Sequence, residues 1–452
     1  MGSNYIEMRL EDCMDAIIDY RGKTPKKVDN GIPLITAKII KNGRIQEVSE
    51  FIAIDDYDNW MVRGLPLEGD VVLTTEAPLG EVAQLDARKV ALAQRVITLR
   101  GKKGILENDY LLYLLQSSFV QNQLDGRASG STVTGIKQSE LREIILKLPP
   151  TTLQKSISHQ LKCLDKKIDL NNKINQTLEQ MSQTLFKSWF VDFDPVIDNA
   201  LDAGNPIPET LQSRAELRQK VRNGADFKPL PVDIRTRFPA EFEETELGWV
   251  PKGWRIENFS EIAQLVKENV KSEDISTDVH YVGLEHLERK HILITNYGNG
   301  SEVSSNKSAF NKGDLLFGKL RPYFHKVAIT PFSGICSTDI LVFRAKEKYY
   351  KSLMAMYAFT DEFVAYANLR STGTRMPRAE AKDLLKYKIV LPNENILEKF
   401  ELLLNDYWSK GQLNNNESKQ LTALRDTLLP KLISGELSLE DLPDLVTQTE
   451  PA

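Results

Sequence analysis

The longest uninterrupted pattern of hydrophobic and polar positions lies between about residues 153 and 190. This stretch contains no glycine or proline, and apolar side chains recur in it in alternating steps of three and four residues. Such spacing places an apolar stripe along one face of an α-helix. The stripe has a polar centre, and buried polar side chains fix the register between packed helices. The predicted packing positions are Leu161, Leu164, Ile168, Asn171, Asn175, Leu178 and Leu185.

A second apolar stripe lies beside the first on the same predicted helix. It consists of Leu170, Ile174, Leu178, Met181 and Leu185. An apolar arc this wide indicates more than one packing neighbour, such as another helix of this chain and a different protein subunit. The alternative is that both stripes face the helix's own domain.

The chain repeats this arrangement once. A Gly-Asp pair followed by three apolar residues begins at Gly69 and again at Gly313, a shift of 244 residues. After a slip of one residue the shift becomes 243, which matches Asn171 with Asn414. A period this long indicates two copies of one module rather than a solenoid. A second long helix is therefore predicted near the C-terminus, with packing positions at Asn414, Ser418, Leu421 and Leu428.

Each copy begins with a mixture of strands and helices. Long apolar-rich stretches without glycine or proline predict helices at residues 110–123 and 349–366. Short β-type runs are found at residues 71–73, 95–99, 326–329 and 340–343. This mixture predicts an α+β domain before each long helix.

Prolines, acidic residues and short polar runs separate the two copies, which predicts a linker with one helix at residues 209–222. The chain ends on an acidic, proline-containing stretch that we expect to be frayed. The predicted division is a first domain at 1–152, a helix at 153–193, a linker at 194–246, a second domain at 247–393, a helix at 394–436 and a flexible tail at 437–452.

Composition and charge exclude several classes of protein. The 452 residues are 41% hydrophobic, and no apolar run approaches the roughly 18 residues of a membrane span. The N-terminal residues lack the pattern of a secretory signal, so we expect a cytoplasmic protein. Cys13, Cys163 and Cys336 are too few and too scattered for a disulfide framework or a cysteine-based zinc site. The net charge of −5 disfavours nucleic acid on average, so a basic face must be sought locally.

Catalytic and metal-binding motifs are not found in the sequence. Residues 130–135 have the glycine spacing of a phosphate loop, but Ile136 and Lys137 follow where lysine and serine or threonine are required. There is no nucleophile elbow, no zinc-protease motif and no Asn-Pro-Pro-aromatic segment of an adenine methyltransferase. The spacing of His280, His286 and His291 does not place two ligands on one helix face. We therefore expect neither covalent chemistry nor a bound metal or cofactor on this chain.

Basic residues gather beside aromatic and hydroxyl side chains on glycine- and proline-rich loops. Such loops suit contacts to phosphates and base edges, although basic loops are more often solvated surface. The candidate DNA-binding residues of the second copy are Lys319, Arg321, Tyr323, Arg370, Thr374, Arg375 and Arg378. Those of the first copy are Arg21, Lys23, Lys38, Arg127, Ser131, Thr132 and Lys137. The copies differ here, because Ala77-Pro78-Leu79 stands opposite Arg321-Pro322-Tyr323.

Three segments resemble the specificity (S) subunit of type I restriction-modification systems, and the resemblance covers essentially the whole chain. One is the central helix from Asn171-Asn172-Lys173 to the run Leu185-Phe186-Lys187-Ser188-Trp189-Phe190. Another is the C-terminal run Leu428-Leu429-Pro430-Lys431-Leu432-Ile433-Ser434-Gly435. The third opens the second copy, with Leu247-Gly248-Trp249-Val250-Pro251.

The resemblance implies a fold and a function. The fold is α+β, with two globular target-recognition domains joined by two long antiparallel helices as a coiled-coil spacer in a pseudo-two-fold internal repeat. Each domain is expected to bind one half of a bipartite, asymmetric site in double-stranded DNA, while the helices set the spacing and dock two methylation (M) subunits. S-adenosylmethionine, ATP and Mg are expected on partner subunits, which include the restriction and translocase (R) subunits.

Two other functions stay open at this stage. One is a fused methyltransferase whose catalytic domain has diverged beyond recognition, although nearly every residue outside the linker belongs to a duplicated unit. The other is a helical scaffold or adaptor that uses its domains for protein contacts alone. Methyl transfer by the isolated chain would indicate the first, and the lack of a specific DNA site would favour the second.

Overall fold

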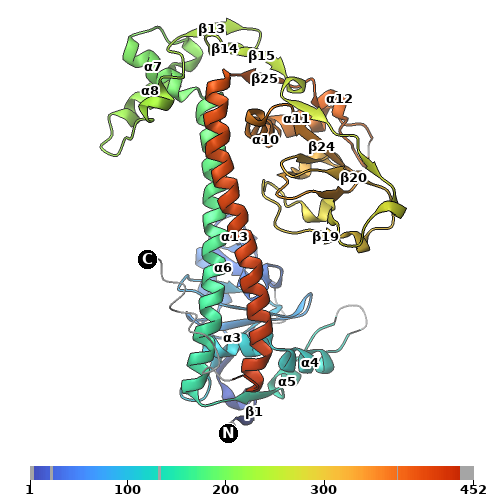
Figure 1. The fold of residues 1–452 in the computed structure, drawn as a ribbon. Helices are drawn as coiled ribbons and strands as arrows, with labels where there is room; N and C mark the ends of the chain where they lie inside the picture. Colours follow the sequence, from blue (N-terminus) through green and yellow to red (C-terminus); the bar gives the residue numbers. More distant parts are fainter. Residues whose placement is uncertain (1–4, 21–23, 131–133, 374, 438–452) are drawn as a thin grey trace. The chain divides into compact units, whose positions relative to one another are not determined.

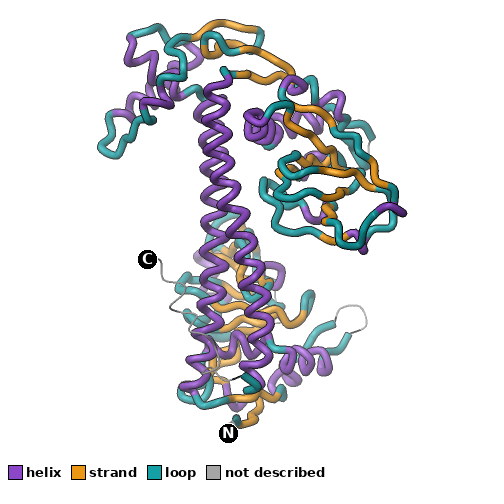
Figure 2. The backbone as a smooth tube through the Cα atoms, in the orientation of Figure 1, coloured by secondary structure: helices purple, strands orange, loops and turns teal. Residues whose placement is uncertain are grey.

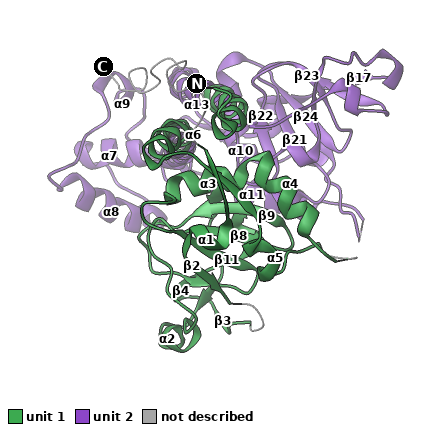
Figure 3. Cartoon of the chain, turned by 90° about the horizontal axis from the view of Figure 1, so that it is seen from below, with its two compact units in different colours: residues 1–170, 417–452 green, residues 171–416 purple. Residues whose placement is uncertain are grey.

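The computed structural model describes residues 5–20, 24–130, 134–373 and 375–437. The chain divides into two compact units, which are coloured separately in Figure 3. Unit 1 comprises residues 1–170 and 417–452, and unit 2 comprises residues 171–416. The two longest helices, α6 (Thr151–Phe186) and α13 (Glu394–Ser434), each contribute residues to both units (Figure 1).

Unit 1 is built on a four-stranded antiparallel sheet in the order β2-β11-β8-β9. Strand β8 (Val71–Thr75) is buried at every position, as expected for a β-branched run inside a sheet. Its neighbours are β2 (Met14–Asp19), β11 (Val96–Gly101) and β9 (Leu79–Gln84). A second sheet joins β10 (Ala91–Leu92), β4 (Ile32–Ile35), β7 (Phe51–Ile52) and β3 (Lys27–Val28). Smaller pairs are β1 (Ile6–Arg9) with β12 (Ile145–Leu148), and β5 (Ile40–Lys41) with β6 (Arg44–Ile45).

Unit 2 repeats the central sheet in the equivalent order β16-β24-β21-β22. These strands span Ala263–Leu265, Ile340–Ala345, Leu315–Gly318 and Val327–Ile329. Its second sheet contains β17 (Asn269–Val270), β20 (Lys307–Phe310), β23 (Gly334–Cys336), β18 (His280–Val282) and β19 (Gly298–Asn299). Strand β15 (Arg255–Asn258) pairs with β25 (Lys388–Leu391), and β13 (Phe242–Thr245) with β14 (Gly248–Pro251). Sheets and helices occur in both units (Figure 2), so the predicted α+β class is confirmed.

Two pairs of helices replace the continuous helices predicted at residues 110–123 and 349–366. They are α3 (Asn108–Gln116) with α4 (Ser118–Arg127), and α10 (Lys351–Ala358) with α11 (Asp361–Leu369). Ser117 and Thr360 stand at the breaks, where each side-chain oxygen accepts a hydrogen bond from a backbone N–H of the following helix. A capped N-terminus therefore interrupts a pattern whose apolar positions continue. Two further short helices follow, α5 (Gln138–Arg142) and α12 (Ala381–Leu384).

The repeated Gly-Asp pair holds the central sheet of each unit together. Asp70 is buried and accepts two hydrogen bonds from the guanidinium of Arg100, both at 2.8 Å. Asp314 does the same with Arg344, at 2.8 and 2.7 Å. The two hydrogen bonds from each guanidinium replace hydrogen bonds to water that the carboxylate loses on burial. The strongest element of the sequence repeat is thus a buried ion pair within each unit.

The two long helices pack against each other in antiparallel orientation. In unit 2, the Nδ2 atom of Asn175 donates to the carbonyl oxygen of Gly411 and to Oδ1 of Asn415, at 3.1 and 2.7 Å. The Nδ2 atom of Asn414 donates to Oδ1 of Asn175 at 2.9 Å. Asn171 lies four residues before Asn175 on α6, and its Nδ2 atom donates to the carbonyl oxygen of Asn414. Asn414 lies three residues after Gly411 on α13. The predicted polar positions therefore lie in one hydrogen-bonded layer.

The other predicted packing positions differ in their burial. In unit 1, Leu161, Leu164, Ile168 and Leu428 are buried, and Arg425 of α13 pairs with Asp165 of α6 at 2.8 Å. Leu178, Leu185, Ser418 and Leu421 are half-buried. Of the second stripe, Leu170 is 50% exposed and Met181 42% exposed. Part of that stripe is therefore open to solvent within the described chain.

The segment after α6 is more ordered than a linker. A π-helix at Lys187–Val191 leads into α7 (Asp194–Ala203), which is followed by α8 (Gln212–Arg222) and α9 (Val232–Arg235). Asp194 and Asp198 of α7 pair with Arg214 and Arg218 of α8, at 2.7 and 2.5 Å. Asp202 is held by Arg222. Aspartates and arginines spaced by four residues lie on the facing sides of two helices, which gives these polar segments a fixed packing.

No helix among the described residues is long and apolar enough to cross a membrane. Of the predicted tail, residues 438–452 lie outside the described part of the chain.

Candidate nucleic-acid interface

Two loops of unit 2 are joined into one surface. They are residues 319–325, which follow β21, and residues 370–379, which follow α11. Arg378 forms isolated β-bridges with Leu320 and with Thr372. The backbone N–H of Arg321 donates to the Pro377 carbonyl at 2.8 Å. Backbone pairing between the loops therefore fixes how their side chains are presented.

The first loop has a constrained backbone. Arg321 and His325 both have φ of 51°, a left-handed conformation that non-glycine residues rarely adopt. The imidazole of His325 is buried, and its Nε2 lies 2.9 Å from the Phe359 carbonyl, to which it donates. Burial lowers the pKa of His325, so the neutral ring is favoured. This contact ties the end of the loop to α10 and α11.

Most of the predicted basic residues of unit 2 lie on these two loops. Lys319, Arg321, Arg370 and Arg375 form no ion pair with any described residue, whereas Arg378 pairs with Asp339 at 3.0 Å. The guanidinium of Arg370 lies over the ring of Tyr366. The ring of Tyr323 is exposed. Thr374 lies outside the described residues.

Unit 1 contains the same pair of bridged loops. Gly135 bridges Glu76 and Ser129, which matches the bridges of Arg378 to Leu320 and Thr372 after the 243- and 244-residue shifts. Ala77, opposite Arg321, also has a positive φ of 48°. A polar cavity of about 340 Å³ lies at these loops, lined by Thr75, Glu76, Gln94, Ser129, Gly135, Ile136 and Lys137.

The predicted basic residues of unit 1 are less concentrated. Lys137 lines the polar cavity, and Arg127 pairs with Glu140 at 3.3 Å. Lys38 lies apart from these loops, 3.8 Å from Glu50. Arg21, Lys23, Ser131 and Thr132 are outside the described residues. The DNA-binding assignment of all these residues stays a prediction.

Comparisons with known proteins point to one family. Residues 3–180 match the Type I restriction modification DNA specificity domain. The MjaIX specificity subunit of Methanocaldococcus jannaschii is 25% identical over 387 residues, which cover 83% of this chain and 79% of the relative. The HindI specificity subunit of Haemophilus influenzae is 24% identical over 389 residues, with coverage of 78% and 82%. Over most of its length the chain is similar to type I specificity subunits.

A solved specificity subunit shares the fold. The crystal structure of the S subunit from M. genitalium superimposes with a TM-score of 0.53 at 14% identity, and covers 95% of this chain and 96% of that one. The strand order and bridged loops described above are therefore set in a known architecture.

In each unit, the bridged loops also contain one residue of an ion pair that the sequence analysis missed. In unit 1, Glu76 pairs with Arg95 at 2.7 Å, and in unit 2, Arg378 pairs with Asp339 at 3.0 Å. Asp339 occupies the position of Arg95 after a shift of 244. The charge at this position is thus reversed, and each unit supplies the partner from a different place, since Glu76 is equivalent to Leu320 and Arg378 to Gly135. The sequence shows that Asp339 stands where the first copy has Arg95. The residues that pair with them, Glu76 and Arg378, can be identified only from the folded structure.

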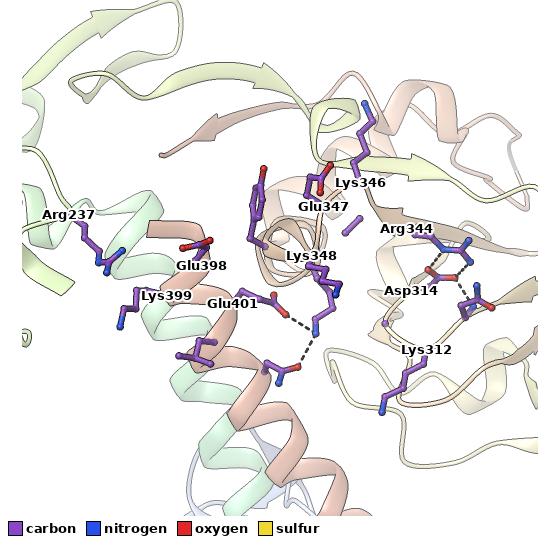
Figure 4. Close-up of a pocket in the computed structure, with 17 residues that line it drawn as sticks. Arg237, Lys312, Asp314, Arg344, Lys346, Glu347, Lys348, Glu398, Lys399 and Glu401 are labelled. Atoms are coloured by element: carbon purple, nitrogen blue, oxygen red, sulfur yellow. Dashed lines mark hydrogen bonds and ion pairs between the residues drawn. The ribbon is translucent and has the colours of Figure 1, made fainter. Parts of the chain in front are cut away.

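Another cavity of unit 2 lies beside α13 (Figure 4). Its volume is about 1270 Å³. Arg344 and Asp314, which line it, form the structural ion pair of the sheet. Lys351 donates to Glu401 at 2.8 Å and to Asn405 at 3.0 Å. Each of these polar groups is therefore engaged with another residue that lines the cavity. Among described residues, no cluster of His, Cys, Asp and Glu is arranged to hold a metal ion.

Proposed function

We propose that this specificity subunit selects a bipartite, asymmetric site in double-stranded DNA for a type I restriction-modification complex. Unit 1 binds one half-site through residues 76–79 and 129–137. Unit 2 binds the other through residues 319–325 and 370–379. The observation that carries this proposal is the same bridged loop pair in both units with different side chains.

The chemistry of the loops supports contacts to DNA. Cationic side chains suit the phosphates, and the hydroxyl, amide and guanidinium groups of the loops suit base edges. Because Glu76 and Arg95 are replaced by Leu320 and Asp339, the two surfaces differ in the positions of donors and acceptors. Different half-sites follow from that difference.

The helices have a second role in this proposal. Helices α6 and α13 set the spacing between half-sites and dock two methylation subunits, and the exposed Leu170 and Met181 suit such contacts. The specificity subunit is not the catalytic component. S-adenosylmethionine, ATP and Mg are assigned to the methylation subunits and to the restriction and translocase subunits.

Footprinting of the complex with its methylation partner tests the function. At one stated salt concentration, we expect protection of two short blocks separated by an unprotected gap. Methylation sequencing of the same DNA is expected to mark adenines in both blocks. Because the loops differ, the two blocks are expected to have different sequences.

Two outcomes would contradict the proposal. Protection without any preferred sequence favours a scaffold that uses its domains for protein contacts. Transfer of labelled methyl groups from S-adenosylmethionine by the purified chain alone would indicate a fused methyltransferase. The control is the methylation partner without this chain, which is expected to protect no specific site.

A further inference from the structure

Two large aromatic side chains project from the first loop of unit 2. Tyr323 is 46% exposed and Phe324 38% exposed, and their ring centroids lie 4.8 Å apart. Aromatic rings are among the side chains that gain most from burial. Adjacent exposed rings therefore suggest a surface that becomes buried in a complex.

The backbone beneath the rings is held in place. Its two left-handed residues, Arg321 and His325, stand on either side of Pro322 and the two aromatic residues. The loop is fastened at one end to the Pro377 carbonyl and at the other to the Phe359 carbonyl. A strained conformation persists only where the surrounding contacts determine it, and such sites are often functional. The rings are thus presented on a rigid turn.

The charges around the rings suit a polyanion. Lys319, Arg321, Arg370 and Arg375 form no ion pairs with described residues, and the Nε atom of Arg321 is buried without a hydrogen-bond partner there. The nearby carboxylate of Asp361 is neutralised by Lys290, at 2.7 Å. Aromatic rings between unpaired cations match duplex DNA, where cations contact phosphates and rings contact bases.

Unit 1 lacks this feature at the equivalent place. Ala77 repeats the left-handed conformation, but Pro78, Leu79 and Gly80 follow it, so no aromatic pair stands there. In unit 1, strand pairing continues past Leu73 and Val82 to Thr75 and Leu79, which leaves residues 76–78 in the turn. In unit 2, the pairing ends at the equivalent positions Phe317 and Val327, which enclose residues 318–326, so the turn of unit 2 is longer.

We propose that Tyr323 and Phe324 form an aromatic wedge that unstacks one base step in the half-site bound by unit 2, whereas unit 1 reads its half-site without a wedge. This inference rests on the proposed function. It explains why the rings remain exposed and why the turn is longer in one copy. Side chains that insert between bases usually act together with cations that hold the flanking phosphates.

The test uses the complex with its methylation partner and DNA that carries 2-aminopurine at successive positions of each half-site. Unstacking raises the fluorescence of this base analogue. Because methylation subunits flip their target adenine out of the stack in both half-sites, the analogue is read at all other positions, where we expect a rise in one half-site only. The double variant Tyr323→Ala, Phe324→Ala should abolish the rise and weaken binding roughly tenfold or more, with an unchanged salt dependence.

Two control variants separate a base contact from other causes. Trp249→Ala removes another partly exposed ring of unit 2, outside the two loops, and is expected to change neither fluorescence nor affinity. Arg375→Ala is expected to weaken binding to all sequences and to reduce the salt dependence by about one phosphate contact. Thermal unfolding of each variant establishes that unit 2 is folded.

The possible failures are distinguishable. If the unaltered complex protects no bipartite site, the proposed function itself fails. If it protects such a site but fluorescence at positions other than the target adenines rises in neither or in both half-sites, the wedge of unit 2 is wrong. A double variant that binds and unstacks DNA like the unaltered protein would also overturn the inference.

Discussion

At the scale of single residues, each unit fastens its sheets to the long helices through carboxylates on α6. In unit 1, Arg44 of β6 pairs with Asp165 and Asp169, at 3.1 and 2.5 Å. These two ion pairs make Arg44 a structural residue. In unit 2, Glu179 accepts hydrogen bonds from the backbone N–H of Ile292 and from the His291 ring. Arginine stays charged at all physiological pH values, whereas histidine titrates.

This difference predicts that the stability of unit 2 depends on pH through His291. The hydrogen bond to the Glu179 carboxylate raises the pKa of His291 above its ordinary 6.5. The stabilisation is therefore complete below about pH 6.5 and is lost as the pH rises through the raised pKa. We expect His291→Gln to destabilise unit 2 more near pH 6 than near pH 9, as measured by denaturant unfolding.

The contribution of His325 to stability has the opposite pH dependence, so the unfolding experiment must separate it from the contribution of His291. Burial lowers the pKa of His325, so its contribution is lost as the pH falls below about 6.5. Comparing His291→Gln with the unaltered protein at each pH cancels that contribution. Arg44→Gln in unit 1 is the matched control and should destabilise equally at both pH values. Equal destabilisation by His291→Gln at both pH values would count against the prediction.

At the scale of elements, the asparagine layer explains why two helices with broad apolar faces adopt one register. An apolar stripe tolerates sliding by one or two turns, but an amide that loses its hydrogen-bond partners on burial costs free energy. The side-chain amide of Asn175 forms hydrogen bonds with Gly411, Asn414 and Asn415 at the same time. A shifted register would therefore leave several of these polar groups without a partner. Gly411 leaves room for the side chain of Leu293, since a Cβ at position 411 would lie 2.5 Å from Cδ1 of that residue.

The asparagine layer can be tested by measuring stability. Asn175→Ala leaves the Gly411 carbonyl and two asparagine amides without their partner, so we expect a loss of about 1–3 kcal/mol in the unfolding free energy of unit 2. Gln176→Ala changes the exposed neighbouring residue and should stay within about 0.5 kcal/mol of the unaltered protein. Urea unfolding measures both, and equal losses would rule out a special role for the layer.

At the scale of the whole molecule, two copies of one module share a pair of helices. Each unit takes part of α6 and part of α13, so neither module is a separate length of chain. Both helices run from one unit into the other without a break. We propose that their length sets the spacing between the half-sites.

Lengthening both helices tests that role. Seven residues inserted after Leu170 in α6, together with seven after Asn416 in α13, add about 10 Å of helix at 1.5 Å per residue. We expect the gap between half-sites to grow by about three base pairs, with both half-sites unchanged, as read by methylation sequencing. Insertion into α6 alone cannot preserve both the Asp165–Arg425 pair and the asparagine layer, so it should abolish binding to the bipartite site. An altered half-site with an unchanged gap would contradict the spacing role.

The sequence by itself determined the repeat, the long helices, the polar centre of their stripe and the resemblance to one family. These features are periodic or local, so they are visible in the order of residues along the chain. It also indicated which loops carry cations, although not which of those cations are engaged: Arg127 and Arg378 form ion pairs, whereas Lys319 and Arg375 form none with described residues.

Only the tertiary structure decided which distant segments meet. The bridges of Gly135 to Glu76 and Ser129, the ion pairs of Arg95 with Glu76 and of Asp339 with Arg378, and the packing of α7 against α8 all join residues separated along the chain. Their free energy depends on desolvation and geometry in the folded state, which local patterns do not encode. For that reason the cations were visible in the sequence, whereas the surface that presents them and the turn that exposes Tyr323 and Phe324 were not.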